Sequence, residues 1–333
     1  MIKHIAVLRA LFLGDFICAQ PALRALKMRF PSAEVTLIGL PWVEPFLRRY
    51  TCIDHFLPFP GCAGVREAPF CPEVTRAFLE AQRGKFDLAI QMHGSGPASS
   101  DLVAGLGARV SLGYTPPGVP SPLSRAIPYP GDRVHEARKW LHLVAHVGAP
   151  GTPEPELPVL PEEEEAASAL LASLDPKRPI VAIHAGARDP ARRWPPERFA
   201  ALADQVWDMR DAQVVLTGSD DDAETVAEVR RACRAPVVDL CGKTTIGELA
   251  AVLDRVDLLV TNDSGPSHVA WARGVPSVVL FGPTDPVRWA PLNERLHRAI
   301  LAPDHDLQKL FLRNVWPTVD TMLAQARGRR SAA

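Results

Sequence analysis

The sequence lacks a long apolar segment, a marked net charge and paired cysteines, and each absence argues against a class of protein. No run of 18 apolar residues occurs, so we expect no membrane span. The N-terminal segment also lacks the small-residue cleavage site of a signal peptide. The formal net charge of −1 argues against nucleic-acid binding, which usually needs a basic excess. The six cysteines show neither CxxC pairing nor metal-ligand spacing, which favours a reduced cytoplasmic protein without structural zinc.

The length and the apolar pattern predict two α/β domains. A chain of 333 residues with 47% hydrophobic residues is too long for one ordinary core. Short apolar runs such as HIAVLR and DLLVTND alternate with amphipathic helical stretches, which is typical of parallel sheets covered on both faces. The proline-rich stretch GAPGTPEPELPVLP reads as a stiff connector. We therefore predict domains over 1–157 and 158–304, with a tail at about 305–330 that packs back on the first domain.

The stretch TNDSGPSHVA directly follows an apolar run, VDLLV, in the second half. Ligands bind at the carboxyl ends of strands in open parallel sheets. Gly265 lets the backbone approach a ligand, and the helix that begins there points amide N–H groups at an anion. Ser264 and His268 add donors, and Asp263 is suited to hold those amides or a sugar hydroxyl. The spacing fits a diphosphate cradle and equally a simple helix cap.

Each of two charged runs near other strand ends has two possible roles. Arg192 and Arg193 follow the strand PIVAIHAG, and one of them facing the strand ends would neutralise a phosphate without a metal. A pair facing solvent is the other reading of this run. The three acids of 220–222 could bind Mg²⁺. We favour a helix start, with one acid or Glu224 near a ribose hydroxyl.

The first domain carries its notable turn just after the strand HIAVLR. Gly14 and Asp15 lie there, and a carboxylate at a helix start is suited to act as a general base. The alternative is a capping acid. A second turn, MHGSG, places His93 and Ser95 near the same edge. We expect these residues to orient an acceptor, although a core role for the histidine fits the pattern as well.

In its order of motifs the chain resembles glycosyltransferase family 9, the ADP-heptose:lipopolysaccharide heptosyltransferases and their relatives. The matching pieces run in order through nearly the whole chain and include LGDFICAQPALRALKMRF, QMHGSG, IHAGARDPARRWPPERF, VVLTGSDDDAE and LCGKTTIGELAAVLDRVDLLVTNDSGPSH. The resemblance implies a GT-B fold, in which two Rossmann-like domains face a central cleft. It also implies an inverting transfer without a metal or other cofactor.

The resemblance also implies roles for individual residues. Asp15 stands where the family has its catalytic base, and Gly14, His93 and Ser95 lie on the acceptor side. Arg192 stands at a position that is often lysine. The tail departs from the family pattern, so of the family's properties the identity of the acceptor is the one that the resemblance supports least. The donor-binding residues that we expect are Arg192, Gly218, Asp222, Glu224, Lys243, Thr244, Thr245, Asp263, Ser264, Gly265 and His268.

The function expected from the sequence is heptosyl transfer from ADP-heptose to a glycan or glycolipid hydroxyl, such as one of the lipopolysaccharide inner core. Alternatives are the same chemistry on a small-molecule acceptor, or a sugar-nucleotide epimerase or hydrolase on the same fold. A nucleotide-sugar sensor without catalysis is a further alternative. We expect a cytoplasmic monomer that binds no nucleic acid and touches the inner membrane face at most peripherally.

Overall fold

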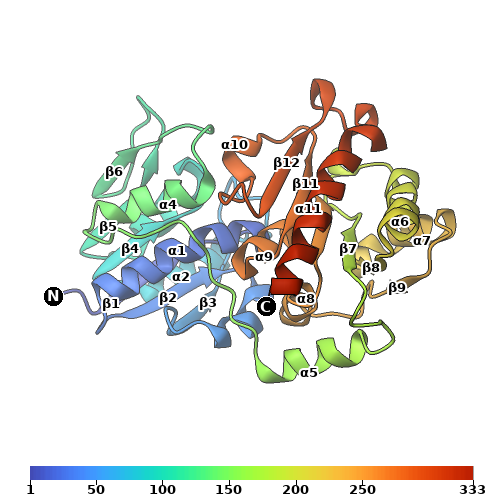
Figure 1. Cartoon of the computed structure of the whole chain (residues 1–333). Coiled ribbons are helices and arrows are strands. Elements are labelled where there is room, and N and C mark those ends of the chain that lie inside the picture. Colours follow the sequence, from blue (N-terminus) through green and yellow to red (C-terminus); the bar gives the residue numbers. More distant parts are fainter. Residues whose placement is uncertain (333) are drawn as a thin grey trace. The chain divides into compact units, whose positions relative to one another are not determined.

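The structure, a computed structural model, describes residues 1–332, and for residues 327–332 only the backbone. The chain divides into two compact units that adjoin in sequence at Glu156 and Leu157, one residue before the predicted boundary. Each unit is an α/β domain with its own six-stranded parallel sheet (Figure 1). Among the described residues, no helix is both long enough and apolar enough to cross a membrane.

The first unit is built on a sheet with the strand order β3-β2-β1-β4-β5-β6. The order reverses at β1, which pairs with β2 on one side and β4 on the other. Ligands bind beyond the carboxyl ends of strands at such a reversal. The strands are β1 (His4–Leu8), β2 (Glu34–Gly39), β3 (His55–Pro58), β4 (Leu88–Gln91), β5 (Val110–Thr115) and β6 (Arg125–Pro128). The helices are α1 (Leu13–Arg29), α2 (Pro72–Gln82), α3 (Pro97–Gly105) and α4 (Glu136–Ala145), with a 3₁₀ helix at Pro41–Arg49.

The second unit repeats this plan with the strand order β12-β11-β10-β7-β8-β9. Its order reverses at β7, between β10 and β8. The strands are β7 (Ile180–His184), β8 (Gln213–Thr217), β9 (Val237–Asp239), β10 (Leu258–Asn262), β11 (Ser277–Phe281) and β12 (His297–Leu301). The helices are α5 (Pro161–Leu170), α6 (Pro196–Arg210), α7 (Ala223–Ala232), α8 (Ile246–Leu253), α9 (Gly265–Arg273), α10 (Pro286–Trp289) and α11 (Leu312–Ala332), with 3₁₀ turns at Pro190–Arg192, Asp220–Asp222, Pro303–His305 and Leu307–Lys309.

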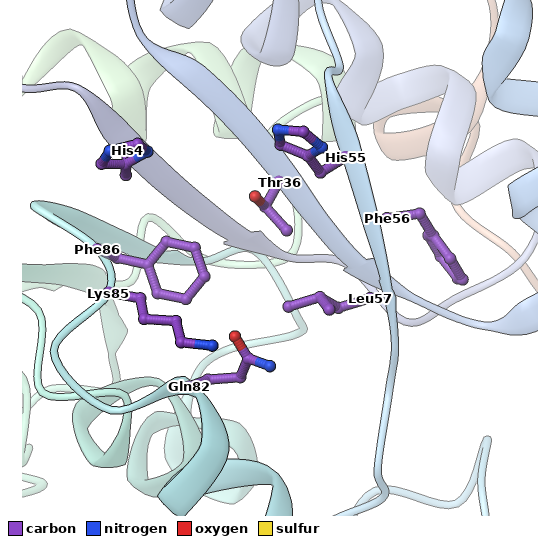
Figure 2. A pocket seen from close by; sticks show the side chains of 8 residues that line it. All are labelled: His4, Thr36, His55, Phe56, Leu57, Gln82, Lys85 and Phe86. Atoms are coloured by element: carbon purple, nitrogen blue, oxygen red, sulfur yellow. The ribbon is translucent and has the colours of Figure 1, made fainter.

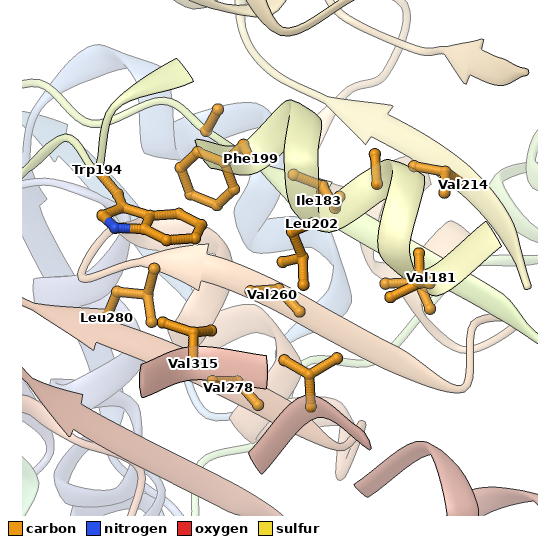
Figure 3. Close-up of a cluster of buried hydrophobic side chains, with 14 of the residues drawn as sticks. Val181, Ile183, Trp194, Phe199, Leu202, Val214, Val260, Val278, Leu280 and Val315 are labelled. Carbon is orange, nitrogen blue, oxygen red and sulfur yellow. The ribbon is translucent and has the colours of Figure 1, made fainter. Parts of the chain in front are cut away.

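The core of the second unit lies between its sheet and the helices α6 and α11 (Figure 3). Aliphatic side chains of the central strands, such as Val181 and Val260, pack there with the rings of Trp194 and Phe199. All four side chains are fully buried. Burial of side chains of this size stabilises a fold by about 1.5–3 kcal/mol each. The rigid sheet that results fixes the strand ends from which the site is built.

The tail belongs to the second unit. Helix α11 packs on α6 and β10 of the second unit, and its residues Val315 and Val319 are fully buried in that unit's core. The segment before α11 is also fastened there. Trp194 donates from Nε1 to the carbonyl of Leu310 at 2.6 Å, and Arg198 donates to three carbonyls of residues 307–310. The apolar face of the tail therefore completes the core of the second unit.

An open pocket of about 500 Å³ lies in the first unit, away from the carboxyl ends of the strands (Figure 2). His4 and His55, which begin β1 and β3, stand on its rim, and Phe56 and Phe86 also line it. Helix α2, whose last residue lines the pocket, has no buried residue. The hollow therefore reflects a loosely packed helix at the end of the sheet where ligands of such folds do not usually bind.

We expect His297 to make the second unit sensitive to acid. Its ring is buried at the start of β12, with Nδ1 2.8 Å from the hydroxyl of Ser277, and burial lowers its pKa to about 4. An unfolded histidine has a pKa of about 6.5, so the unfolded chain binds an extra proton between these values. Stability is therefore present above about pH 6.5 and falls as the pH drops toward 4, by about 2 kcal/mol between pH 7 and 5.

Urea unfolding of wild type and His297→Gln at pH 7 and 5 measures this loss. The variant should lose less stability between the two pH values, while His305→Gln, at an exposed position, should behave as wild type. The same pH dependence in all three proteins would contradict the assignment.

Candidate active site

Asp15 lies at the carboxyl end of β1, in the first turn of α1. The helix is capped at Phe12 without a side-chain hydrogen bond, so Asp15 is not the capping residue. Its carboxylate is 22% exposed and accepts a hydrogen bond from Nη2 of Arg9 at 3.1 Å. Gly14, directly before it, is half-buried in the same turn. A partly exposed carboxylate held by a cation at a strand end is placed as a base should be.

The MHGSG turn follows β4, the neighbour of β1. His93 is mostly buried, its ring stacks on Phe59, and its Nε2 lies 3.7 Å from a carboxylate oxygen of Glu67. Burial, together with the cation of Arg9, lowers the pKa of His93 to about 4 despite the opposing carboxylate of Glu67. The imidazole is therefore neutral at pH 7 and suited to a hydrogen bond with an uncharged hydroxyl. Ser95 is half-buried in the same turn.

Gly96 fixes the shape of this turn. Its φ is +112°, and a Cβ atom there would overlap the carbonyl oxygen of Tyr114. The turn is also held by the hydroxyl of Ser100, which donates to the Gly96 carbonyl at 2.8 Å. Gly96, at the end of the turn, is therefore held by contacts with Tyr114 and Ser100.

Replacement of this glycine should be costly. We expect Gly96→Ala to lower the melting temperature and weaken acceptor use, because the backbone must shift to relieve both strain and overlap, at a cost of about 1–3 kcal/mol. Gly94→Ala is the matched control, since its φ is also positive, at +60°, but no atom lies within 4 Å of an added Cβ. Thermal denaturation of both variants checks this, and equal losses would show that the overlap is unimportant.

In the second unit Asp263 follows β10, and it is almost fully buried. Its Oδ2 accepts a hydrogen bond from the hydroxyl of Thr284 at 2.7 Å and lies 3.6 Å from Nη1 of Arg192. Asp263 therefore joins three loops at the carboxyl ends of the strands. Its position suits the orientation of Arg192 better than direct contact with a sugar.

Arg192 and Arg193 have different surroundings. Arg193 donates from Nε to the carbonyl of Ala187 at 2.7 Å, which fixes its own loop. The side chain of Arg192 is 40% exposed, and its buried Nε has no hydrogen-bond partner among the described residues. Arg192 therefore has donor capacity left for a ligand, whereas Arg193 uses its Nε to hold its own loop. Its guanidinium presents a fork that matches a phosphate.

The start of α9 is the predicted anion cradle. Ser264 is its capping residue, but its side chain makes no capping hydrogen bond and instead lies 3.3 Å from the carbonyl of Asn262. Gly265 begins the helix, so the first-turn amides are not satisfied by that hydroxyl. His268 is buried, with its ring centre 6.2 Å from that of Trp289. The simple cap reading is thus not what the geometry shows.

The loops after β8 and β9 carry the remaining predicted donor residues. Asp222 is buried and accepts hydrogen bonds from the amide and hydroxyl of Ser219, at 2.9 and 2.7 Å. A Cβ on Gly186 would overlap the Asp222 carboxylate, so this acid packs against the loop after β7. Gly218 lies against Asp222 as well, and Glu224 is exposed in the first turn of α7. Both acids therefore stand at the strand ends, with Asp222 the more firmly held.

The loop CGKTT follows β9. Thr245 caps α8 through a reciprocal pair of hydrogen bonds with Glu248, and Lys243 donates to the carbonyl of Asp239 at 2.7 Å. Thr244 is half-buried between them. Two of the three predicted residues thus have structural partners. The run at 220–222 forms a 3₁₀ turn, and nowhere in the described chain do three or more metal-ligating side chains gather into a metal site.

Three polar residues that hold these loops, two of them buried and Thr284 half-buried, escaped the sequence prediction. They are Arg9, Asn262 and Thr284. The side chain of Asn262 accepts from the amide of Trp194 at 3.0 Å and donates to the carbonyl of Ala185 at 2.8 Å, so it joins the loop of Arg192 to β10. In the sequence, the only sign of these roles was a polar residue in or next to an apolar run.

A family model described as "Glycosyltransferase family 9 (heptosyltransferase)" matches residues 75–310, which is most of the chain. The chain belongs to glycosyltransferase family 9. It is therefore a transferase, and the predicted family and fold class are confirmed. A family 9 relative, lipopolysaccharide heptosyltransferase 2 of Salmonella typhimurium, is 29% identical over 315 residues, which cover 87% of this chain and 86% of the relative.

Two solved structures show the same fold. A family 9 glycosyl transferase from Veillonella parvula superposes with a TM-score of 0.79 at 23% identity, over 97% of each chain. The ADP-heptose lps heptosyltransferase II of E. coli has a TM-score of 0.75 at 24% identity, over 98% of this chain and all of that chain. The two six-stranded parallel sheets of this family 9 member are thus those of the GT-B fold.

Proposed function

We propose that this family 9 member transfers heptose from ADP-heptose to a hydroxyl group of the lipopolysaccharide inner core, with inversion at the anomeric carbon and without a metal or other cofactor. The cytoplasm is the proposed location. The Salmonella and E. coli relatives are named lipopolysaccharide heptosyltransferases, which supports the sugar and the acceptor class. The observation that carries the proposal within this chain is Arg192, held by Asp263 at the strand ends with donor capacity left over.

In the proposed reaction the diphosphate lies against the first turn of α9, beside Arg192. Asp15 accepts the proton of the acceptor hydroxyl as the oxygen attacks C1 of the sugar. The bond from C1 to the diphosphate breaks on the opposite face, and ADP leaves with the electron pair. Fixed donors, namely the helix amides and the guanidinium, stabilise the charge that develops on the leaving diphosphate. His93, neutral at pH 7, orients the acceptor.

Product analysis tests this proposal. The protein is incubated with ADP-heptose and truncated lipopolysaccharide from a strain that lacks heptosyltransferase 2, and mass spectrometry should show the addition of one heptose. NMR of the product should show inverted anomeric configuration. Consumption of ADP-heptose at the same rate without acceptor would favour a hydrolase or epimerase instead, and binding without turnover would favour a sensor.

Removal of metal ions should leave the rate unchanged. We expect full activity in excess EDTA, because the proposed leaving-group charge is stabilised by protein groups. A rate that collapses in EDTA and returns with Mg²⁺ would contradict this part of the proposal and direct attention to the acids at 220–222.

A further inference from the structure

Arg9 is a buried cation that directly follows β1. Its side chain is only 1% exposed. Through Nε and Nη2 it donates to the backbone carbonyl of Asp15, at 3.2 and 2.9 Å, and Nη2 also reaches the Asp15 carboxylate at 3.1 Å. Nη1 donates to the carbonyl of Met92 at 2.7 Å. One guanidinium therefore ties the first turn of α1 to the start of the MHGSG turn.

A second pair of buried charges lies behind Arg9, on α4. Glu136 places a carboxylate oxygen 3.7 Å from Nη2 of Arg9 and another 3.0 Å from Nζ of Lys139. The side chains of Glu136 and Lys139 are 3% and 1% exposed. Lys139 also donates to the hydroxyl of Tyr129 at 2.9 Å, and the ring of Trp140 lies 4.8 Å from the guanidinium carbon of Arg9. The four charged groups Asp15, Arg9, Glu136 and Lys139 thus alternate in sign.

Stability alone is a weak reason to keep such a chain of charges. Removing a carboxylate or a cation from water costs several kcal/mol, and replacement of a buried ion pair by apolar side chains is often neutral or stabilising. What the ion pairs do supply is a single geometry. A guanidinium has five N–H donors in a rigid plane, so its bonds to Asp15 and Met92 fix the orientation of both segments together.

We propose that Arg9 is a positioning residue for the Asp15 carboxylate, and that the buried Glu136–Lys139 pair acts on Asp15 through Arg9. This inference rests on the proposed function, because it assumes that Asp15 is the base. The charge of Arg9 faces that carboxylate at 3.1 Å, and Glu136 and Lys139 on α4 fix where the charge of Arg9 lies. One side chain, that of Arg9, therefore fixes the positions of both the Asp15 carboxylate and the MHGSG turn.

A double-mutant cycle on kcat tests this, with ADP-heptose and the truncated lipopolysaccharide as substrates. Arg9→Met should lower kcat by about 10–100-fold and leave the KM for ADP-heptose within about twofold. In the Asp15→Asn background the same change should alter kcat less than about threefold, because a base that is absent cannot be mispositioned. Lys139→Met should show the same pattern with a smaller loss, and Arg9→Lys should recover part of the rate.

The pH–rate profile provides a readout that a purely structural role would not move. The acid limb of kcat should shift to higher pH in Arg9→Met and less in Arg9→Lys, which keeps the charge. Arg49→Met is the matched control, since it removes another buried arginine of the same domain, one that donates to the Phe46 carbonyl. It should lower stability without moving the limb.

The outcomes separate this inference from the function on which it rests. Equal loss of kcat in both backgrounds, with an unmoved acid limb, overturns the positioning role while transfer by wild type stands. If wild type transfers no heptose, the proposed function fails and the inference fails with it. If Arg9→Met does not fold, the cycles with Lys139→Met and Arg9→Lys decide by the same criteria.

Discussion

Asp15→Asn should lower kcat by about 10²–10⁴-fold and leave the affinity for ADP-heptose nearly unchanged. The substitution keeps the shape of the side chain but removes its capacity to accept a proton, and general bases contribute rate factors of this size. The amide can still meet the Arg9 guanidinium through its oxygen, so the first turn of α1 should keep its place. Steady-state kinetics and calorimetric titration with ADP-heptose measure the two quantities.

A surface acid of the same domain serves as the control for this experiment. Asp54→Asn lies just before β3, where its carboxylate accepts from Nζ of Lys27 at 2.7 Å. This variant should retain at least about half of the wild-type kcat, since surface substitutions usually have small effects. A wild-type rate for Asp15→Asn itself would show that the carboxylate only holds its helix.

Arg192→Met should weaken ADP-heptose binding by about 10–100-fold. Hydrogen bonds to charged groups contribute about 1.5–3 kcal/mol, and this side chain is 40% exposed and has an Nε without a partner among the described residues. Arg192→Lys should recover only part of the affinity, because an ammonium cannot form the same two parallel bonds. Calorimetric titration measures the affinities.

The salt dependence of binding separates a phosphate contact from a structural role for Arg192. Affinity of the wild type should fall with added salt more steeply than affinity of Arg192→Met. Arg230→Met is the matched control, since it removes a surface arginine of the same unit that is paired with Asp239. Unchanged affinity in Arg192→Met would remove this residue from the site and leave the first turn of α9 as the sole anion contact.

The sequence predicted the central strands well because their burial is visible in the apolar character of their own residues. Strands such as β1 and β10 are buried over most or all of their length, so most of their residues are apolar and the strands are easy to find. The edge strands β6 and β12 cannot be found by this pattern, since RAIP and HRAIL are partly exposed and lack a continuous apolar run. Edge strands have one open side, and polar residues are tolerated there.

The surface on which the tail packs could not be predicted from the residues of the tail itself. Val315, Val319 and Leu323 recur at helical spacing, which indicates one buried face. That pattern does not say which surface the face meets, and the length of the tail is compatible with packing on either domain. The partners that decide the matter are Trp194 and Arg198, more than 100 residues earlier in the sequence.

The sequence predicted the site residues that lie in the turns after the strands. It did not predict the residues that hold those turns in place from elsewhere in the chain. Asp15 and Arg192 stand at strand ends, and the sheet brings them to those edges. Arg9 and Asn262 act through carbonyls and amides of distant loops, and such pairings depend on three-dimensional contact. Their roles therefore emerge only once the chain is folded.

The attachment of α11 to the second unit has a consequence during synthesis. All strands of the first unit precede residue 129, so that domain can fold while the ribosome is still translating the rest. The second domain cannot complete its core until residues 315–323 have been synthesised, because Val315 and Leu323 belong to that core. Until they leave the exit tunnel, Trp194 and the neighbouring Arg192 turn lack their support. The second domain should therefore mature last, and only after nearly the whole polypeptide has been made.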